Sequence, residues 1–317
     1  MAKYMGKRFL FTILTLILVT IFLFLLTHVS GADPAKIMLG TNATPEAVEA
    51  MRAKLGLDRP WYVQYFSWIS DLLHGDLGTS YYRDEKVSDL LVKYFKPTLA
   101  LAIYSELIAI IIGVPMGIMQ AKNKGKASSV IISTITLIGL SIPGFLLGLF
   151  LMFFFSVKIK IFPVSGYKAI IEGFGEHIKS LVLPSLALGL SQAALITRTT
   201  NSAMLEVLNS EYIKTARAKG VNERTILWKH ALRNAMIPII TVCGQSFAVL
   251  FGGAVVIETI FNISGLGTLV YNSISNRDYS IIQGAVLVIA LVYVVINLLV
   301  DVLYGIEDPR IRVGGKK

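Results

Sequence analysis

The stretch FLFTILTLILVTIFLFLLTHV, residues 9–29, decides the fold: it holds 21 residues without Asp, Glu, Lys or Arg. As an α-helix rising about 1.5 Å per residue it is ~31 Å long, which matches the hydrocarbon core of a bilayer at about 30 Å. Helices of soluble proteins carry charged stripes every three or four residues. Five further apolar runs lack such stripes: residues 97–120 (interrupted only by Glu106), 127–157, 180–197, 234–257 and 279–300. The six runs predict six membrane spans in an all-α polytopic membrane protein.

The composition of the whole chain agrees with this prediction. Of its 317 residues, 54% are hydrophobic and only 16% are charged, whereas soluble domains carry about 25% charged residues. The same figures exclude a disordered chain and a fibrous repeat. The single cysteine, Cys243, excludes a disulfide scaffold and a structural zinc site built from thiolates.

Two of the runs allow more than one interpretation. Run 9–29 follows basic residues and precedes Ser30-Gly31-Ala32, as in a signal peptide, but its length exceeds the 7–15 residues of a signal-peptide core and favours an uncleaved first span. Run 127–157 would reach about 46 Å as one helix, so it must tilt or break. Ser141-Ile142-Pro143-Gly144 predicts a break, either a packing kink or a hinge that lines a cavity.

The distribution of charge predicts the orientation in the membrane. Six spans place both termini on one side, where residues 1–8, 121–126, 198–233 and 301–317 carry 17 Lys and Arg against 5 Asp and Glu, leaving aside Asp301 at a span end. On the other side, residues 30–96, 158–179 and 258–278 carry 13 basic residues; leaving aside Glu258 at a span end, they carry 12 acidic ones. The positive-inside rule therefore predicts cytoplasmic termini. It makes 30–96 an extracytoplasmic segment between the first span (1–29) and a five-helix core (97–317).

The net charge of +10 thus reflects membrane topology, since a nucleic-acid binder would show a basic face on a folded domain. No P-loop occurs, because Gly125-Lys126 is preceded by Gln120 where the first glycine is required. No zinc-protease or serine-hydrolase motif occurs either. The sequence predicts that the chain is not an enzyme, binds no metal and draws its energy from an ion gradient or a partner.

The cytoplasmic loop at 198–235 holds the most informative pattern. Asn209 or Ser210 can cap a short helix, Gly220 can end it, and Asn222-Glu223 can begin the next helix. Small residues at Ala216 and Ala218 would allow another surface to approach closely, and Tyr212 and Ile213 would offer apolar anchors. A connector and a docking site are both compatible with this pattern.

The loop sequence EYIKTARAKG (211–220), followed by HALRNAMIP (230–238), resembles the EAA loop of permease subunits from binding-protein-dependent ABC importers. It resembles in particular the B-type permease of dipeptide and oligopeptide importers. Other segments of this family occur in the same order along the chain: GADP (31–34), LGLDRP (55–60), GDLGTS (75–80), VIETIF (256–261), GLG (265–267) and DPRIR (308–312). They extend over nearly the whole sequence.

The resemblance implies the six-helix, MetI-like fold of type I importers and a coupling role for the loop. The short helix would fit a groove of a cytoplasmic ATPase subunit through Glu211, Tyr212, Ile213, Thr215, Ala216, Arg217, Ala218, Lys219 and Gly220. The general pattern has Glu-Ala-Ala six residues before the glycine, where this chain has Lys214-Thr215-Ala216, and His230 and Arg233 replace the usual Ile and Pro. The peptide branch shows the same changes, so a salt bridge from the missing glutamate is not carried over.

Polar residues within the spans are candidates for the translocation path. A charged group at mid-bilayer costs about 2.5–3.5 kcal/mol on insertion scales, so Glu106 is expected to face other helices or water. It can be an interhelical carboxyl group or a path residue. The other path candidates are Gln192, Gln245, Glu258 and Asn262.

The resemblance also implies an assembly in a bacterial or archaeal cytoplasmic membrane. Its parts would be a second, homologous permease, two ATPase subunits that bind ATP and Mg²⁺, and an extracytoplasmic solute-binding protein. Peptides are the expected cargo, with nickel chelates, glutathione and oligosaccharides as alternatives within the family. A secondary transporter would show repeated halves and paired ionisable residues at the midplane, and an intramembrane enzyme would show a catalytic constellation; neither pattern occurs.

Overall fold

In the computed structural model, the described residues are 2–29, 33–40 and 43–307. Helices form nearly all of the secondary structure in these ranges, and the β structure there is limited to an isolated antiparallel bridge between Thr79 and Lys86. The prediction of an all-α chain is therefore confirmed.

The chain forms two compact units. The first unit comprises Met1–Tyr4, Pro97–Ser264 and Val295–Lys317, and the second comprises Met5–Lys96 and Gly265–Val294. Two long helices, α5 (Val87–Lys122) and α14 (Tyr279–Glu307), contribute residues to both units.

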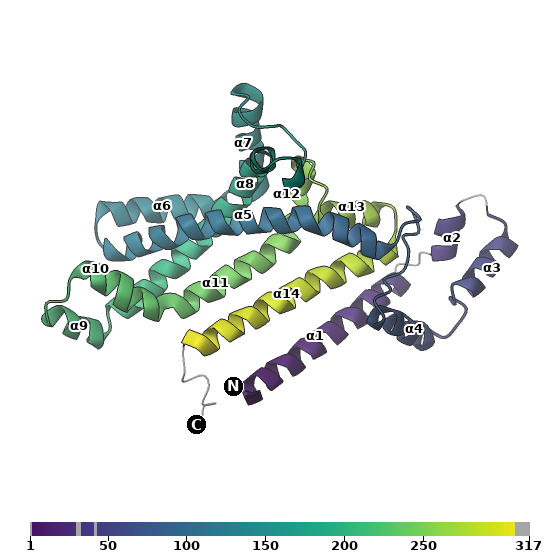
Figure 1. The fold of residues 1–317 in the computed structure, drawn as a ribbon, viewed down its shortest axis with the longest axis horizontal. Coiled ribbons are helices and arrows are strands. Elements are labelled where there is room, and N and C mark those ends of the chain that lie inside the picture. Colours follow the sequence, from purple (N-terminus) through teal and green to yellow (C-terminus); the bar gives the residue numbers. More distant parts are fainter. Residues whose placement is uncertain (1, 30–32, 41–42, 308–317) are drawn as a thin grey trace. The chain divides into compact units, whose positions relative to one another are not determined.

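The first unit is built around α8, which packs against α6, α7 and α11 (Figure 1). Its elements, besides parts of α5 and α14, are α6 (Ala127–Ser141), α7 (Gly144–Leu151), the π-helix η1 (Met152–Lys158), the 3₁₀-helix η2 (Ile170–Glu172), α8 (Phe174–Leu208), α9 (Glu211–Ala218), α10 (Glu223–Thr225), the π-helix η3 (Ile226–Ala231), α11 (Leu232–Gly253) and α12 (Val255–Ile260).

Glycines bring α5 and α8 into close contact. A Cβ atom on Gly113 would lie 2.8 Å from the carbonyl oxygen of Ala193, and one on Gly117 would lie 2.5 Å from the Cβ of Thr200. Gly113 and Gly117 form a small-xxx-small pair of the kind that allows membrane helices to pack backbone to backbone. Sequence reasoning about charge-free runs did not identify this contact.

The predicted break in run 127–157 occurs between α6 and α7. Ile142 has an extended ψ of 120°, and Pro143 precedes the first residue of α7. The two helices are bent by 97° (Figure 1). This angle is far larger than that of a packing kink, and the chain changes direction here. Among the described residues, five helices are long and apolar enough to cross a membrane, or six if the bent pair is counted as one span.

The second unit contains α1 (Ala2–Val29) from Met5 onward, α2 (Pro34–Leu39), α3 (Pro45–Lys54), α4 (Trp61–Leu73) and α13 (Leu266–Ser275), with parts of α5 and α14. Aromatic rings join α4 to the last turns of α1: Phe24 lies 5.3 Å from the ring of Tyr65 and 6.2 Å from that of Trp68. Buried Asp278 accepts a 2.5 Å hydrogen bond from Ser80 and thereby joins the loop before α5 to the start of α14.

Several helix boundaries differ from the charge-free runs. Helix α5 begins at Val87, so Pro97 lies inside it, and Pro184 and Pro238 lie inside α8 and α11. An apolar run marks the part of a helix suited to lipid, whereas the helix itself continues into polar flanks. The motif residues 31–32 and 308–312 lie outside the described residues.

Candidate functional site

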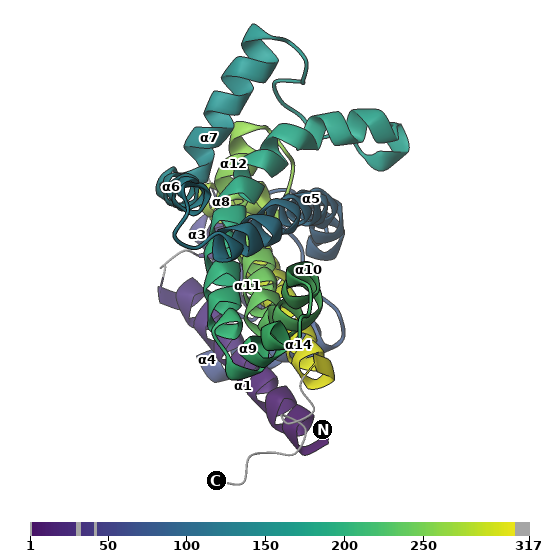
Figure 2. The ribbon, with the colours of Figure 1, turned by 90° about the vertical axis from the view of Figure 1, so that its left-hand side faces the viewer.

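The short helix predicted in the loop at 198–235 forms as α9, between the end of α8 and the start of α10 (Figures 1 and 2). Ser210 occupies the N-cap position, but its hydroxyl donates to the carbonyl oxygen of Val207 at 2.5 Å instead of capping α9. The next helix begins as predicted, because the Asn222 side chain accepts a hydrogen bond of 2.9 Å from the backbone N–H of Arg224.

Gly220 ends α9 with a left-handed backbone, at a φ of +76°. Its N–H donates to the carbonyl oxygen of Arg217 at 2.9 Å, and the N–H of Val221 donates to that of Ala216 at 3.1 Å. These two bonds are the pattern of a Schellman motif, in which glycine is preferred because it lacks a Cβ atom.

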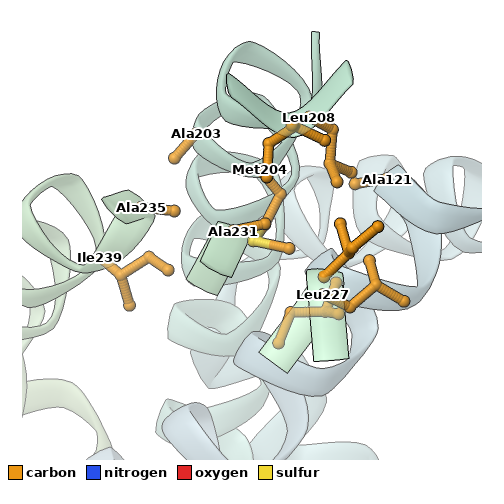
Figure 3. Packing of buried hydrophobic residues seen from close by; sticks show 11 residues of the cluster. Ala121, Ala203, Met204, Leu208, Leu227, Ala231, Ala235 and Ile239 are labelled. Atoms are coloured by element: carbon orange, nitrogen blue, oxygen red, sulfur yellow. The ribbon is translucent and has the colours of Figure 1, made fainter. Parts of the chain in front are cut away.

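Ile213 fastens α9 to the rest of the first unit. Its side chain is fully buried in a cluster with residues of α5, α8, η3 and α11, among them Met204, Leu208 and Leu227, which Figure 3 shows turned toward one another. Ile213 is therefore not available as the outward apolar anchor that the sequence suggested. The helical spacing of the loop could have indicated this, because Ile213 is the one large aliphatic side chain of α9.

Charged side chains fix the outer face of α9. Lys214 pairs with Glu211 at 2.7 Å, and the Arg217 Nε donates to Glu223 at 2.7 Å across the turn that contains Gly220. Both pairs are exposed and contribute little to stability; the first lies within α9, and only the second spans the α9–α10 turn.

The exposed residues of α9 and its C-terminus form a polar surface with a small apolar part. Tyr212 is 45% exposed, and its hydroxyl lies 3.4 Å from the carbonyl oxygen of His230. Thr215, Ala218 and Lys219 are also exposed, and Ala216 is half-buried. A partner that contacts α9 therefore meets Tyr212, Thr215, Ala218 and the two ion pairs.

The first buried carboxyl group in the apolar segments belongs to Glu106 on α5. It is 7% exposed, and one of its oxygens accepts a 2.5 Å hydrogen bond from the hydroxyl of Ser246 on α11. Its other oxygen, Oε1, has no hydrogen-bond partner among the residues that the structure describes. Glu106 faces other helices, as the cost of a carboxyl group in lipid requires.

The second buried carboxyl group belongs to Glu258 on α12. It is fully buried and accepts a 2.6 Å hydrogen bond from the hydroxyl of Thr98 on α5. Thr98 and Ser246 are the residues that sequence reasoning missed at these sites. Their partners lie 160 and 140 residues away along the chain, so no local pattern could reveal them.

The remaining path candidates are less enclosed. Gln192 on α8 is half-buried, whereas Gln245 on α11 and Asn262 after α12 are exposed. Asn262 has a φ of +49°, a left-handed conformation that asparagine tolerates better than most residues. The structure does not gather the five candidates into one cluster of hydrogen-bonded residues.

Comparisons with known proteins agree along the whole chain. Residues 113–313 match the family described as the inner membrane component of binding-protein-dependent transport systems, and residues 1–102 match the N-terminal part described for such membrane components. A probable peptide ABC transporter permease of Sinorhizobium fredii is 40% identical over 98% of this chain and 100% of its own length. Glutathione transport system permeases of Shigella flexneri and Escherichia coli are also 40% identical, over 98% of this chain and 99% of theirs.

Solved structures show the same fold. Two inward-facing structures of the MetNI methionine ABC transporter superpose with TM-scores of 0.58 and 0.57, at 20% and 23% identity, and cover 69% of this chain and 96% of theirs. The resemblance found in the sequence is thus confirmed. The chain belongs to the family of inner membrane components of binding-protein-dependent transport systems, the permeases of ABC importers.

Proposed function

We propose that the chain is the transmembrane permease subunit of an ATP-driven importer of peptides and forms half of its translocation pathway. The observation that carries this proposal is the 40% identity to a probable peptide ABC transporter permease over the full length of that relative. Glutathione, itself a tripeptide, is the second candidate cargo, because permeases of glutathione systems are equally similar.

In this proposal the chain works only within an assembly in a bacterial or archaeal cytoplasmic membrane. A second, homologous permease completes the pathway, two cytoplasmic ATPase subunits bind ATP and Mg²⁺, and an extracytoplasmic binding protein delivers the solute. The segment 30–96 faces that binding protein, and both termini are cytoplasmic. The chain contributes no catalytic residue of its own.

Residues 209–220 couple ATP hydrolysis to the spans. Support comes from the way α9 is built: one buried side chain, Ile213, connects it to α8 and α11, and a Schellman motif and two ion pairs fix its outer face. A rigid helix with one face exposed and the other packed on two spans can transmit a push from a partner.

Uptake into proteoliposomes tests the cargo. The assembled complex with its cognate binding protein should take up labelled dipeptides or short oligopeptides when ATP is inside the reconstituted cytoplasmic compartment. Unlabelled glutathione, a nickel chelate and an oligosaccharide serve as competitors. Competition by the nickel chelate and the oligosaccharide, but not by glutathione or any other peptide, would overturn the proposed cargo.

Substitution in the loop tests the coupling. Ala216→Arg adds bulk beside the Schellman turn, and Gly220→Asp places a side chain at a φ of +76°. Both variants should insert into the membrane normally but lose solute-stimulated ATPase activity. Normal stimulation and uptake in both would argue against a coupling role for α9.

A further inference from the structure

Two segments of the family pattern, at 31–34 and 55–60, contribute residues to one cavity of the second unit. Asp33 and Pro34 belong to the segment at 31–34, and Leu55, Leu57 and Arg59 belong to that at 55–60; all five line the cavity. It has a volume of about 720 Å³, within the range of about 300–1,000 Å³ for small-molecule sites.

The floor of the cavity is aromatic. Phe24 on α1 and Trp68 on α4 both line it, and their rings stack at 6.2 Å between centroids. Phe24 is 6% exposed, and a hydrogen bond of 3.0 Å between the hydroxyls of Thr20 and Tyr65 also joins α1 to α4. The last turns of α1 are thus held on α4 by packing, so the floor is preformed.

One ion pair in the wall is already satisfied. Arg52 at the end of α3 donates from Nε and Nη2 to one oxygen of Asp33, at 2.9 and 2.5 Å. The other oxygen of Asp33 accepts from the backbone N–H of Ala35 at 3.1 Å. This pair ties the start of α2 to the end of α3 and leaves no net charge for a ligand.

Three charged side chains in the wall remain unpaired: among the described residues, Lys54, Arg59 and Asp71 form no ion pair. The backbone that carries Arg59 is held in place, because the Gln64 side chain donates to the carbonyl oxygens of Leu57 and Arg59 at 3.2 and 2.8 Å. The Arg59 side chain passes over Gly56, at 3.7 Å from the position of a Cβ atom there, and Gly56 itself turns the chain with a φ of +68°. The cavity thus offers two cations and one anion beside an aromatic floor.

From these charges we propose that the cavity binds a small zwitterion with an apolar part. Its oxyanion would pair with Arg59 and Lys54, its ammonium with Asp71, and its hydrocarbon would lie on Phe24 and Trp68. Two sources share this chemistry: a phospholipid with an amine headgroup and a free short peptide. Among the described residues, the cavity lining includes neither Glu106 nor any residue of α9, and binding here can be tested apart from the proposed cargo.

Fluorescence of Trp68 in the assembled complex tests the site. Trp61→Phe and Trp228→Phe leave Trp68 as the single tryptophan of this chain, and tryptophan-free variants of the other subunits remove their signal. Dialanine and glycerophosphoethanolamine are titrated in detergent. Phosphatidylethanolamine is compared with phosphatidylglycerol in nanodiscs, and ATP is left out so that transport has no part in the result.

We expect the Trp68 emission to change saturably as the probe is added. The affinity read from this titration should be at least tenfold lower in Arg59→Ala and in Asp71→Asn. Arg59→Lys, which keeps the charge, should retain most of the affinity, and Asp58→Asn, in the same loop but outside the cavity wall, should match the parent. Binding of dialanine identifies a peptide as the source, whereas a response to phosphatidylethanolamine alone identifies a lipid. No response to any probe, or equal binding by Arg59→Ala and Asp71→Asn, would overturn the proposal.

Discussion

The attachment of α9 to the spans through Ile213 leads to a quantitative prediction. Ile213→Ala removes three carbons from a fully buried side chain. At about 0.8 kcal/mol per buried methylene, the lost burial free energy is about 2.4 kcal/mol. Observed costs of such substitutions run from about 2 to 5 kcal/mol, because the cavity that is left adds to the lost burial. Every 1.4 kcal/mol is tenfold in an equilibrium constant, so α9 should detach about 50 times more often.

Hydrogen exchange measures this opening directly. In the assembled complex, the helical amides near the end of α9 should exchange about 50-fold faster in Ile213→Ala than in the parent. Ile213→Val removes one carbon and should give about a fourfold change from a loss of about 0.8 kcal/mol. Exposed Thr215→Val is the matched control and should leave the core-facing contacts intact.

Unchanged exchange in Ile213→Ala, or equal acceleration in Ile213→Ala and Thr215→Val, would refute this attachment of α9. Either result would show that α9 is not held by the buried cluster. Solute-stimulated ATPase activity should fall in the same order as the exchange protection, because a detached helix cannot transmit a push.

Three further predictions concern other parts of the chain. Gly117→Ala should lower the free energy of unfolding by about 1–3 kcal/mol through overpacking against α8. In Gly252→Ala the added Cβ meets no atom within 4 Å, so this control should be neutral or stabilising by up to about 1 kcal/mol. Equal effects on the thermal unfolding of the complex would exclude a specific contact at Gly117. Ser246→Ala should lower the free energy of unfolding by about 1–3 kcal/mol because Glu106 loses its hydrogen bond. The same substitution should cost less when it is made in a Glu106→Gln variant. An equal cost in the parent and in that variant would argue against the Glu106–Ser246 pair. Burial raises the pKa of Asp33, but the hydrogen bonds and charge of Arg52 outweigh it, so the pKa lies below the ordinary 3.8. Above about pH 5, the unfolding temperature of the parent should therefore exceed that of Asp33→Asn by a constant margin. This margin should shrink as the pH falls through the lowered pKa. A margin that grows on acidification would contradict a lowered pKa of Asp33.

The sequence predicted those parts of the structure that local chemistry determines. The end of α9 at Gly220 and the start of α10 after Asn222 were predicted correctly, because a left-handed glycine and a side-chain cap act within a few residues. The break before Pro143 was predictable for the same reason, since proline lacks the N–H that a helix needs. The size of the bend depends on what α7 packs against and was not predictable.

Contacts between distant helices were beyond sequence reasoning. The partners of Glu106 and Glu258 could not be identified from one sequence, because Ser246 and Thr98 are ordinary span residues until the helices are assembled. The sequence of α9 marks Ile213 as its one large aliphatic side chain, but which residues of η3 and α8 cover it depends on the assembled helices. The start of α5 at Val87 was missed because a charge-free run reports lipid compatibility and not helix length.

Cross-linking of α9 to the ATPase subunit tests the central claim most directly. In a Cys243→Ser background, which leaves this chain without its own cysteine, Ala218→Cys introduces a thiol on the exposed end of α9, and Ser202→Cys places the control on the exposed side of α8. With a short bifunctional thiol-to-amine reagent, the account predicts an adduct of this chain and the ATPase subunit from Ala218→Cys, with loss of solute-stimulated hydrolysis, and much less adduct from Ser202→Cys. Absence of an ATPase adduct from Ala218→Cys, or an adduct that leaves stimulated hydrolysis unchanged, would contradict it.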